Sequence, residues 1–428
     1  MDNNFRHRRV KIIKINLSNM ILYENKRKKL ISVLKWGNNP FKKFVCTGEI
    51  REELGLVKSR KDLIRKIEKI VEEDKNFILP IIGDVGGGKT HLYWALKNSL
   101  YRYNTFYISL EYIYKKFFYN IYSEFIENLE LAPLKFIINR LCDEWGALER
   151  KFGFFHVADL EKIKNFAFKL LSNKYNDMET ETLTNIISGI VAHQLDPYKK
   201  IEAERWLLGE LMDAKELSSL NISHDLRKGK NAFMMLMLLI ENSKSGTILF
   251  IDDFEKIISI TEPKDDSAEE IYDPSWLYGA DKSPDDIASE KVFDKIVQLQ
   301  QIEGLRIIIT LKSIDSLEEI KKKYQEQNAE LLFSIKDPLF LLDFNEEDIF
   351  EFYKESMRYF YENMGISDFI NAFQNPYFPL NKRILRNIFE NTKGNPREII
   401  KALIKIFNEI IYSDEKLDAV LENYENIC

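Results

Sequence analysis

The sequence predicts an α/β fold with a parallel sheet, and three observations support this. Short apolar runs of strand length alternate with stretches whose apolar residues recur at helical spacing. The first of them follow the order strand, glycine loop, helix, strand, which is typical of a βαβ unit. A long helical stretch then separates the second strand from the third. The pattern predicts a sheet with a large helical insertion and a C-terminal helical lid.

The elements follow in order along the chain. A helix is predicted at 59–70, where Leu63, Ile64, Ile67 and Ile70 have helical spacing, and another at 89–100. Strands are predicted at 77–82, 105–110, 246–253, 305–311 and 338–344, and helices throughout 111–245 and beyond Asn345. The predicted segments are a basic arm (1–43), the first part of the sheet domain (44–111), the helical insertion (112–245), the second part of the sheet domain (246–344) and the lid (345–428).

Composition excludes several classes of protein. With 428 residues and 45% hydrophobic content, the chain can bury a large core and form more than one domain. The apolar run Phe233–Ile240 is too short to span a bilayer, and the first residues do not resemble a secretion signal. The three cysteines show no CxxC spacing, which argues against a zinc ribbon. We therefore expect a cytoplasmic protein with no membrane contact.

Residues 83–90 read GDVGGGKT and match the phosphate-binding pattern G-x-x-x-x-G-K-[ST] between a predicted strand and a predicted helix. Glycines allow successive backbone N–H groups to face an anion, and the helix start adds its positive dipole end. Lys89 can reach the β- and γ-phosphates, and Thr90 can ligate Mg²⁺. His91 follows in the first helical turn, where we expect packing or capping rather than catalysis. The predicted ATP-binding segment comprises Gly83, Asp84, Val85, Gly86, Gly87, Gly88, Lys89, Thr90 and His91.

The strand at 246–253 ends in carboxylates, as a magnesium-dependent hydrolase requires. Asp252 is the expected magnesium ligand, together with Thr90. Asp253 is the candidate to orient or deprotonate the attacking water, and Glu255 is the alternative base. Thr310, at the end of what we expect to be a neighbouring strand, can hold that water or sense the γ-phosphate. It can equally be a hydrogen-bonded core residue.

The turn Thr392–Arg397 lies between two predicted helices, and Arg397 at the start of the second can reach nucleotide phosphates. Guanine recognition by an Asn-Lys-x-Asp loop is not indicated, because the nearest stretch, 173–176, has no aspartate in register. ATP with Mg²⁺ is therefore the predicted cofactor.

The chain is acidic overall, yet its N-terminal arm is strongly basic. Residues 1–43 contain twelve lysines and arginines against two acidic residues, whereas the whole chain has a net charge of −6. A basic arm of this kind indicates binding to DNA phosphates without sequence specificity. The alternatives are a solvated tail or a patch that docks on the acidic body.

These motifs resemble those of AAA+ ATPases and their STAND-like relatives. The matching parts are 83–90 (Walker A), 248–253 (Walker B), Thr310 (sensor 1) and Gly394–Arg397 (sensor 2). Asn39–Phe41 and Lys58–Arg60 are similar to a segment of archaeal origin-recognition and helicase-loader ATPases, which implies that Arg60 lies at the adenine. P-loop ATPases of the BREX phage-exclusion type are similar in Glu204–Glu210, in Leu220–Ile222 and in the long helix before residue 248.

Two features depart from that resemblance. About 160 residues separate Thr90 from Asp252, which makes the helical block a true insertion. The segment 321–337, where a ring-forming AAA+ protein carries its arginine finger, has lysines but no arginine. Lysine is a poor replacement for the planar guanidinium.

The sequence thus predicts an ATP-driven switch that acts with DNA, in defence against mobile elements or in replication and maintenance, and that can form homo-oligomers. A second class is a nucleotide-gated scaffold with little hydrolysis, which recruits protein partners through the insertion. A third, a small-molecule kinase, is disfavoured by the lid and the sensor 2 turn.

Overall fold

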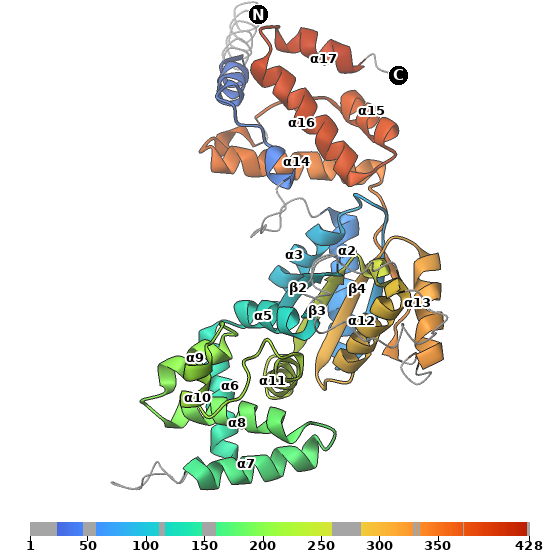
Figure 1. Cartoon of the computed structure of the whole chain (residues 1–428). Helices are drawn as coiled ribbons and strands as arrows, with labels where there is room; N and C mark the ends of the chain where they lie inside the picture. The colour runs from blue at the N-terminus through green and yellow to red at the C-terminus, as the bar shows by residue number, and fades with distance from the viewer. Residues whose placement is uncertain are drawn as a thin grey trace, which may run out of the picture. The chain divides into compact units, whose positions relative to one another are not determined.

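The computed structural model describes residues 24–45, 57–110, 116–147, 160–258, 284–327, 332, 334–370 and 372–425 (Figure 1). The chain divides into two compact units. We call Ile67–Ile82 with Ser99–Phe340 the sheet unit, and Met1–Lys66, Gly83–Asn98 and Leu341–Cys428 the helical unit. The polar, acidic stretch 262–286, where the sequence indicates a surface excursion, lies almost wholly outside the described residues.

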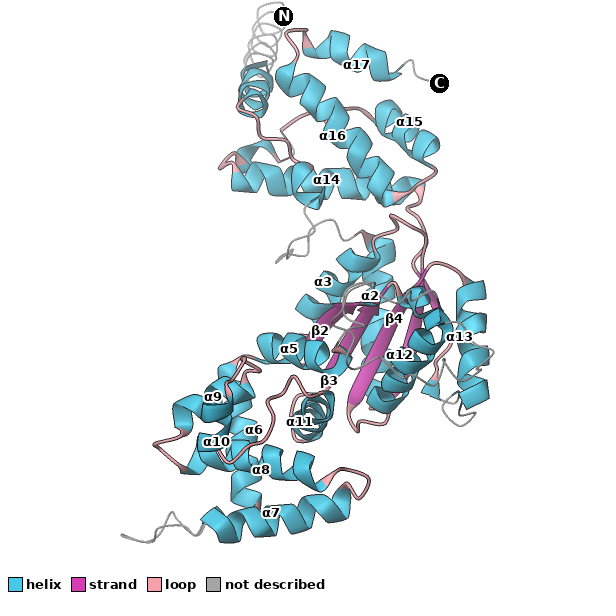
Figure 2. Ribbon diagram, viewed as in Figure 1, coloured by secondary structure: helices cyan, strands magenta, loops and turns pink. Residues whose placement is uncertain are grey.

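The sheet has five strands in the order β2-β3-β4-β1-β5, and every pairing is parallel (Figure 2). The strands are β1 (Phe77–Ile82), β2 (Asn104–Ser109), β3 (Thr247–Asp252), β4 (Leu305–Leu311) and β5 (Leu339–Phe340). All residues of β1, β3 and β4 are buried, as expected for parallel strands whose two faces are both covered. The predicted parallel α/β sheet is therefore confirmed. Strand β4, which carries Thr310, lies between β1 and β3, and so it is the neighbouring strand that the sequence predicted.

The last strand is shorter than predicted. The sequence indicated 338–344, but only Leu339 and Phe340 pair with β1. Beyond them, the chain leaves the sheet: the N–H of Phe344 donates a 2.9 Å hydrogen bond to the carbonyl of Gly394. In this run Phe340 is 50% exposed and Leu342 is 69% exposed, so apolar residues over a strand-length stretch do not by themselves show that a strand forms there.

The helices of the predicted insertion share one hydrophobic core with the sheet. Helix α5 packs on β2, where the rings of Phe125 and Phe106 lie 5.5 Å apart, and α11 packs on α5 and α8. The helices of this unit are α5 (Phe117–Leu129), α6 (Leu131–Glu144), α7 (Leu160–Lys174), α8 (Thr180–Leu195), α9 (Lys200–Leu207), α10 (Ala214–Ser219), α11 (Gly229–Glu241), α12 (Pro284–Gln300) and α13 (Ile314–Gln327), with the 3₁₀ helix η3 (Phe254–Ile258) after β3.

The helical unit has a separate core, built from segments far apart in the sequence. Phe41 is fully buried there, with its ring 5.8 Å from Tyr353 and 5.1 Å from Phe407. The elements of this unit are a helix over 24–35, η1 (Lys42–Val45), α3 (Lys89–Ser99), α14 (Glu346–Asn363), η6 (Ser367–Phe369), α15 (Lys382–Thr392), α16 (Pro396–Tyr412) and α17 (Leu417–Glu425); α2 (Lys58–Glu73) begins here and ends in the sheet unit. Among the described helices, none is long and apolar enough to span a membrane.

Part of the predicted basic arm belongs to this helical core. Leu30, Val33 and Leu34 are buried in it, because they form one apolar face of the helix over 24–35. Lys26 pairs with Asp368 at 3.4 Å, and Arg27 pairs with Asp418 at 2.6 Å. For these residues, the structure matches the docked alternative rather than a solvated tail. Residues 1–23, with five of the arm's twelve cations, lie outside the described residues.

A tight helix contact in the sheet unit allows a stability test. A Cβ on Gly189 of α8 would lie 2.5 Å from the ring of the fully buried Trp206, whereas one on Gly229 of α11 would meet nothing closer than 3.9 Å. We expect Gly189→Ala to lower the free energy of unfolding by about 1–3 kcal/mol through overpacking. Gly229→Ala, the matched control, should be neutral or slightly stabilising. Equal urea unfolding midpoints for the two variants would contradict this packing.

Candidate functional site

The glycine loop follows β1 directly and leads into α3. Gly86 and Gly88 adopt left-handed backbone angles, with φ of +86° and +99°, which glycine adopts without strain. The N–H of Gly87 donates to the carbonyl of Asp84 at 3.0 Å and closes a turn within the loop. Glycine is thus required at Gly86 and Gly88 by backbone conformation.

The residues after the loop begin α3, as predicted. The ammonium of Lys89 lies over the loop and donates to the carbonyls of Gly83 (2.9 Å) and Asp84 (3.4 Å). Thr90 is exposed and His91 is half-buried in the first turn. A hydrogen bond from the N–H of Leu92 to the carbonyl of Gly88 (2.9 Å) closes that turn. The loop therefore carries a cation and a hydroxyl at a helix N-terminus, the chemistry that binds phosphate.

Arg60, near the start of α2, contacts the glycine loop. Its guanidinium donates to the carbonyl of Gly87 at 3.2 Å and lies 5.2 Å from the ring centroid of Phe344. Burial lowers the pKa of Arg60 from its ordinary value, while the nearby carboxylates of Asp348 and Asp343 oppose the shift. The side chain stays charged, because an arginine pKa lies far above neutral pH. Arg60, which the sequence predicted as an ATP-binding residue, thus contacts the backbone of the glycine loop.

The Gly394–Arg397 turn also lies against the loop. The side-chain amide of Asn395 donates to the carbonyl of Val85 at 3.1 Å, and the backbone N–H of Arg397 donates to the carbonyl of Gly86 at 3.2 Å. The side chain of Arg397 is exposed beside the loop. A Cβ on Gly86 would lie 2.7 Å from Oδ1 of Asn395, so the close approach requires glycine.

A second group of candidate residues lies in the sheet unit, where β3 ends. Asp252 is 4% exposed, and both of its carboxylate oxygens accept hydrogen bonds: Oδ1 from the hydroxyl of Thr310, and Oδ2 from that of Tyr107 at 3.0 Å. The parallel pairing of β3 with β4 and with β2 brings these hydroxyls to the carboxylate. A buried carboxylate needs such donors, because it has lost its hydration.

Asp253 adopts a left-handed backbone conformation, with φ of +51°, which is uncommon for a residue with a side chain. Its N–H donates to the hydroxyl of Thr310 and to Oδ1 of Asp252, each at 3.1 Å. Its carboxylate lies 3.5 Å from the ammonium of Lys256. Glu255, in η3, has Oε2 buried without a hydrogen-bond partner within the described structure. Both predicted bases thus lie immediately after the strand.

For two of the predicted site residues, Thr310 and Arg60, the structure shows contacts that the sequence did not specify. For Thr310, the sequence leaves open a role with water or the γ-phosphate and a role as a hydrogen-bonded core residue; in the structure its hydroxyl is buried and joins Asp252 to the backbone of Asp253. Arg60 was expected at adenine from the resemblance, and it contacts a loop carbonyl.

The sequence reasoning missed three residues near these groups. Tyr107 and Asn395 were not singled out, although the Asn395 position at a helix start was a visible signal. Asp343 was also missed: its Oδ1 is buried without a partner in the described part of the chain. Burial, and then the charge of Asp84, raise the pKa of Asp343, while Arg60 opposes the shift.

The structure therefore forms two groups, each within one unit. The first group lies around the glycine loop in the helical unit and consists of Lys89, Arg60, Asn395 and Arg397. The sheet unit holds Asp252, Asp253, Glu255, Thr310 and Tyr107. Within the described residues, no group of three or more histidine, cysteine, aspartate or glutamate side chains could hold a metal ion alone.

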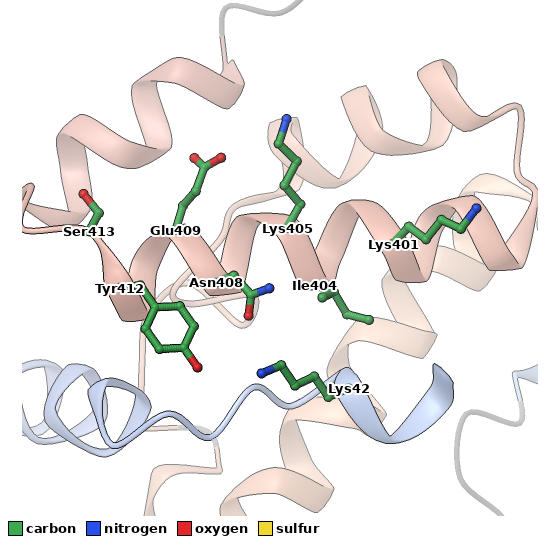
Figure 3. Close-up of a pocket in the computed structure, with 8 residues that line it drawn as sticks. All are labelled: Lys42, Lys401, Ile404, Lys405, Asn408, Glu409, Tyr412 and Ser413. Carbon is green, nitrogen blue, oxygen red and sulfur yellow. The ribbon is translucent and has the colours of Figure 1, made fainter. Parts of the chain in front are cut away.

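A groove of about 950 Å³ on α16 has a different character (Figure 3). Tyr412, Asn408 and Ile404 face the segment that carries Lys42. Lys405 and Glu409 point away from that segment, on the other side of the helix. The polar groups of this groove do not converge on a common point, so it is not a catalytic arrangement.

Comparisons with known proteins do not identify a relative: no protein-family model matches the chain, and no curated protein matches it. The site must therefore be interpreted from its own geometry.

The hydrogen bonds of Thr310 can be tested by an isosteric change. Thr310→Val removes the donor to Asp252 and the acceptor for the N–H of Asp253, so we expect a loss of about 1–3 kcal/mol in the free energy of unfolding. Thr105→Val is the matched control, because the Thr105 hydroxyl on β2 is buried without a hydrogen-bond partner among the described residues. That variant should be neutral or stabilising. If urea denaturation shows that the two variants change the free energy of unfolding equally, the hydrogen bonds of Thr310 do not contribute specifically to stability.

Proposed function

We propose that the chain binds ATP with Mg²⁺ through its glycine loop, and that it works as a nucleotide-dependent molecular switch. The observation that carries this proposal is the loop itself: a full G-x-x-x-x-G-K-T pattern placed between β1 and α3, with left-handed glycines and a lysine folded over it. Such a loop directs backbone N–H groups at an anion, and its lysine neutralises phosphate charge. Thr90 would supply a hydroxyl ligand to the metal.

Thr90 and Asp252 are the residues that we propose as magnesium ligands, and for Asp252 the proposal draws on the sheet topology. Parallel strands end at one edge, and β1 and β3 are separated only by β4. Gly83 follows the last residue of β1, and Asp252 is the last residue of β3. The loop therefore begins at the edge where the acidic strand ends. Ligands of open α/β sheets bind at this carboxyl edge.

Hydrolysis of ATP is the second part of the proposal. Asp253 would accept a proton from the attacking water, or Glu255 would do so in its place. Arg397, exposed beside Gly86, would stabilise negative charge on the phosphates. The likeness to AAA+ ATPases belongs to this proposal, supported by the parallel sheet and the C-terminal helices.

A nucleotide-gated scaffold with little hydrolysis is the second candidate, and two observations favour it. The carboxylate of Asp253 is close to the ammonium of Lys256, and the hydroxyl of Thr310 both donates to Asp252 and accepts from the N–H of Asp253. In this case, ATP would control the recruitment of protein partners by helices of the sheet unit.

Two substitutions test the nucleotide site. Lys89→Ala should weaken ATP binding at least about ten-fold, because the loop loses its cation. Asp252→Asn should retain binding but abolish magnesium-dependent phosphate release. Lys97→Ala, on the same helix, is the control and should bind ATP as the unmodified protein does.

Titration calorimetry and a phosphate-release assay distinguish the candidates. Turnover that is lost in Asp252→Asn supports an ATPase. Tight binding of ATP without turnover supports the scaffold. If the unmodified protein binds no ATP in the presence of Mg²⁺, the proposed function is wrong.

DNA is the partner we propose for the basic arm. Seven of its twelve cations lie within 24–43, and at least two of these pair with acidic residues of the helical unit. Residues 1–23 contribute five cations and one acidic residue, so their charge supports binding to phosphates.

Removal of residues 1–23 tests this partner and leaves the buried Leu30, Val33 and Leu34 in place. We expect weaker binding to a labelled DNA duplex, and a salt dependence whose slope falls by up to about 4, since each lost phosphate contact contributes about 0.9. ATP binding should not change. Fluorescence anisotropy at several salt concentrations measures both quantities. Unchanged DNA affinity would exclude this part of the arm as a DNA-binding element.

A further inference from the structure

Three consecutive carbonyls of the glycine loop accept hydrogen bonds from outside the loop. Asn395 donates to Val85 at 3.1 Å, the N–H of Arg397 to Gly86 at 3.2 Å, and Arg60 to Gly87 at 3.2 Å. We propose that Asn395 and Arg60 are positioning residues of the phosphate site, which act through the loop backbone and couple phosphate binding to helix α16. This inference rests on the proposed function.

The planarity of the peptide bond explains how such contacts act. In a trans peptide, the carbonyl of one residue and the N–H of the next point in opposite directions. Holding the carbonyl of Val85 therefore orients the N–H of Gly86, and holding that of Gly87 orients the N–H of Gly88. These are the two loop glycines with left-handed angles. Glycine peptides rotate easily, so their direction must be imposed by partners.

These hydrogen bonds also depend on how closely the segments of the chain that make them approach one another. Gly394 has φ of +81°, and a Cβ there would lie 2.2 Å from the carbonyl oxygen of Phe344. A Cβ on Gly86 would lie 3.0 Å from the Cβ of Arg397. The 394–397 turn is therefore packed against the loop on one side and against the backbone after β5 on the other, and a shift of the turn must move its neighbours.

Asn395 connects the loop to α16 through the two ends of one amide. Its Nδ2 donates to Val85, while its Oδ1 accepts from the N–H of Glu398 at 3.4 Å and caps the helix. Phosphate binding that orders the loop would favour the conformation in which the 394–397 turn is bound to the loop. That conformation would in turn favour phosphate binding. Such coupling is reciprocal by thermodynamic necessity.

The test is Asn395→Asp. Aspartate keeps the oxygen that caps α16 and is an equally good N-cap, but it replaces the donor to Val85 with a second acceptor. We expect the affinities for ATP and for inorganic tripolyphosphate, each with Mg²⁺, to fall by about the same factor of ten, since the loss concerns phosphate and not adenine. Hydrogen exchange of the peptide covering 83–92 should accelerate before any ligand is added.

The matched control is Asn381→Asp, which makes the same change at the N-cap of α15 and removes a hydrogen bond to Glu425. It should leave both affinities and the loop exchange unaltered. A second pair is Arg60→Lys, which loses the guanidinium that reaches Gly87, and Arg65→Lys on the same helix. In the described part of the chain, Arg65 pairs with Asp62, three positions before it. Arg60→Lys should weaken tripolyphosphate binding, and Arg65→Lys should not.

The outcomes separate this inference from the proposed function. If the unmodified protein binds ATP and Asn395→Asp binds it equally well, the coupling is wrong and the ATP site stands. Slower or unchanged exchange of the loop in that variant also overturns the coupling. If neither ATP nor tripolyphosphate binds the unmodified protein, the proposed function itself fails.

Discussion

The hydrogen bonds donated to the carbonyls of the glycine loop are the constraint on which the helical unit depends. A loop with glycine at four of its first six positions has few side chains to hold its own peptides, so their direction comes from partners. Arg60 of α2 and the turn before α16 supply those partners. Three stretches of sequence, before residue 67, around 83–98 and after 340, therefore form one compact unit.

A buried carboxylate imposes a comparable constraint in the sheet unit. Asp252 is nearly inaccessible to water, and its two oxygens accept from hydroxyls on β4 and β2, the strands on either side. The same Thr310 hydroxyl accepts from the N–H of Asp253, whose backbone conformation is strained. The end of β3 is thus held rigidly by its neighbours. Such rigidity suits a metal site, where ligand geometry must be preserved, and it supports either proposed function equally.

The basic arm shows that a count of charges gives an incomplete description of a segment when its apolar periodicity is left out. Counting lysine and arginine indicated a grip on nucleic acid, yet the helix over 24–35 also places Leu30, Val33 and Leu34 on one face, and the structure buries them in the helical core. Both signals were present in the sequence. The apolar face explains why this segment docks, and the cations around it then pair with Asp368 and Asp418.

What the sequence determined by itself was local. The glycine loop, the limits of β1 and β4, the helices on either side of residue 394 and the acidic end of β3 all follow from spacing and residue type over a few positions. The tertiary structure alone decided that Tyr107 reaches Asp252, that Asn395 and Arg60 hold the loop, and that β5 stops after two residues. Periodicity shows which face of an element is buried. Periodicity does not show which segment of the chain covers that face, because the covering segment lies hundreds of residues away or on another strand.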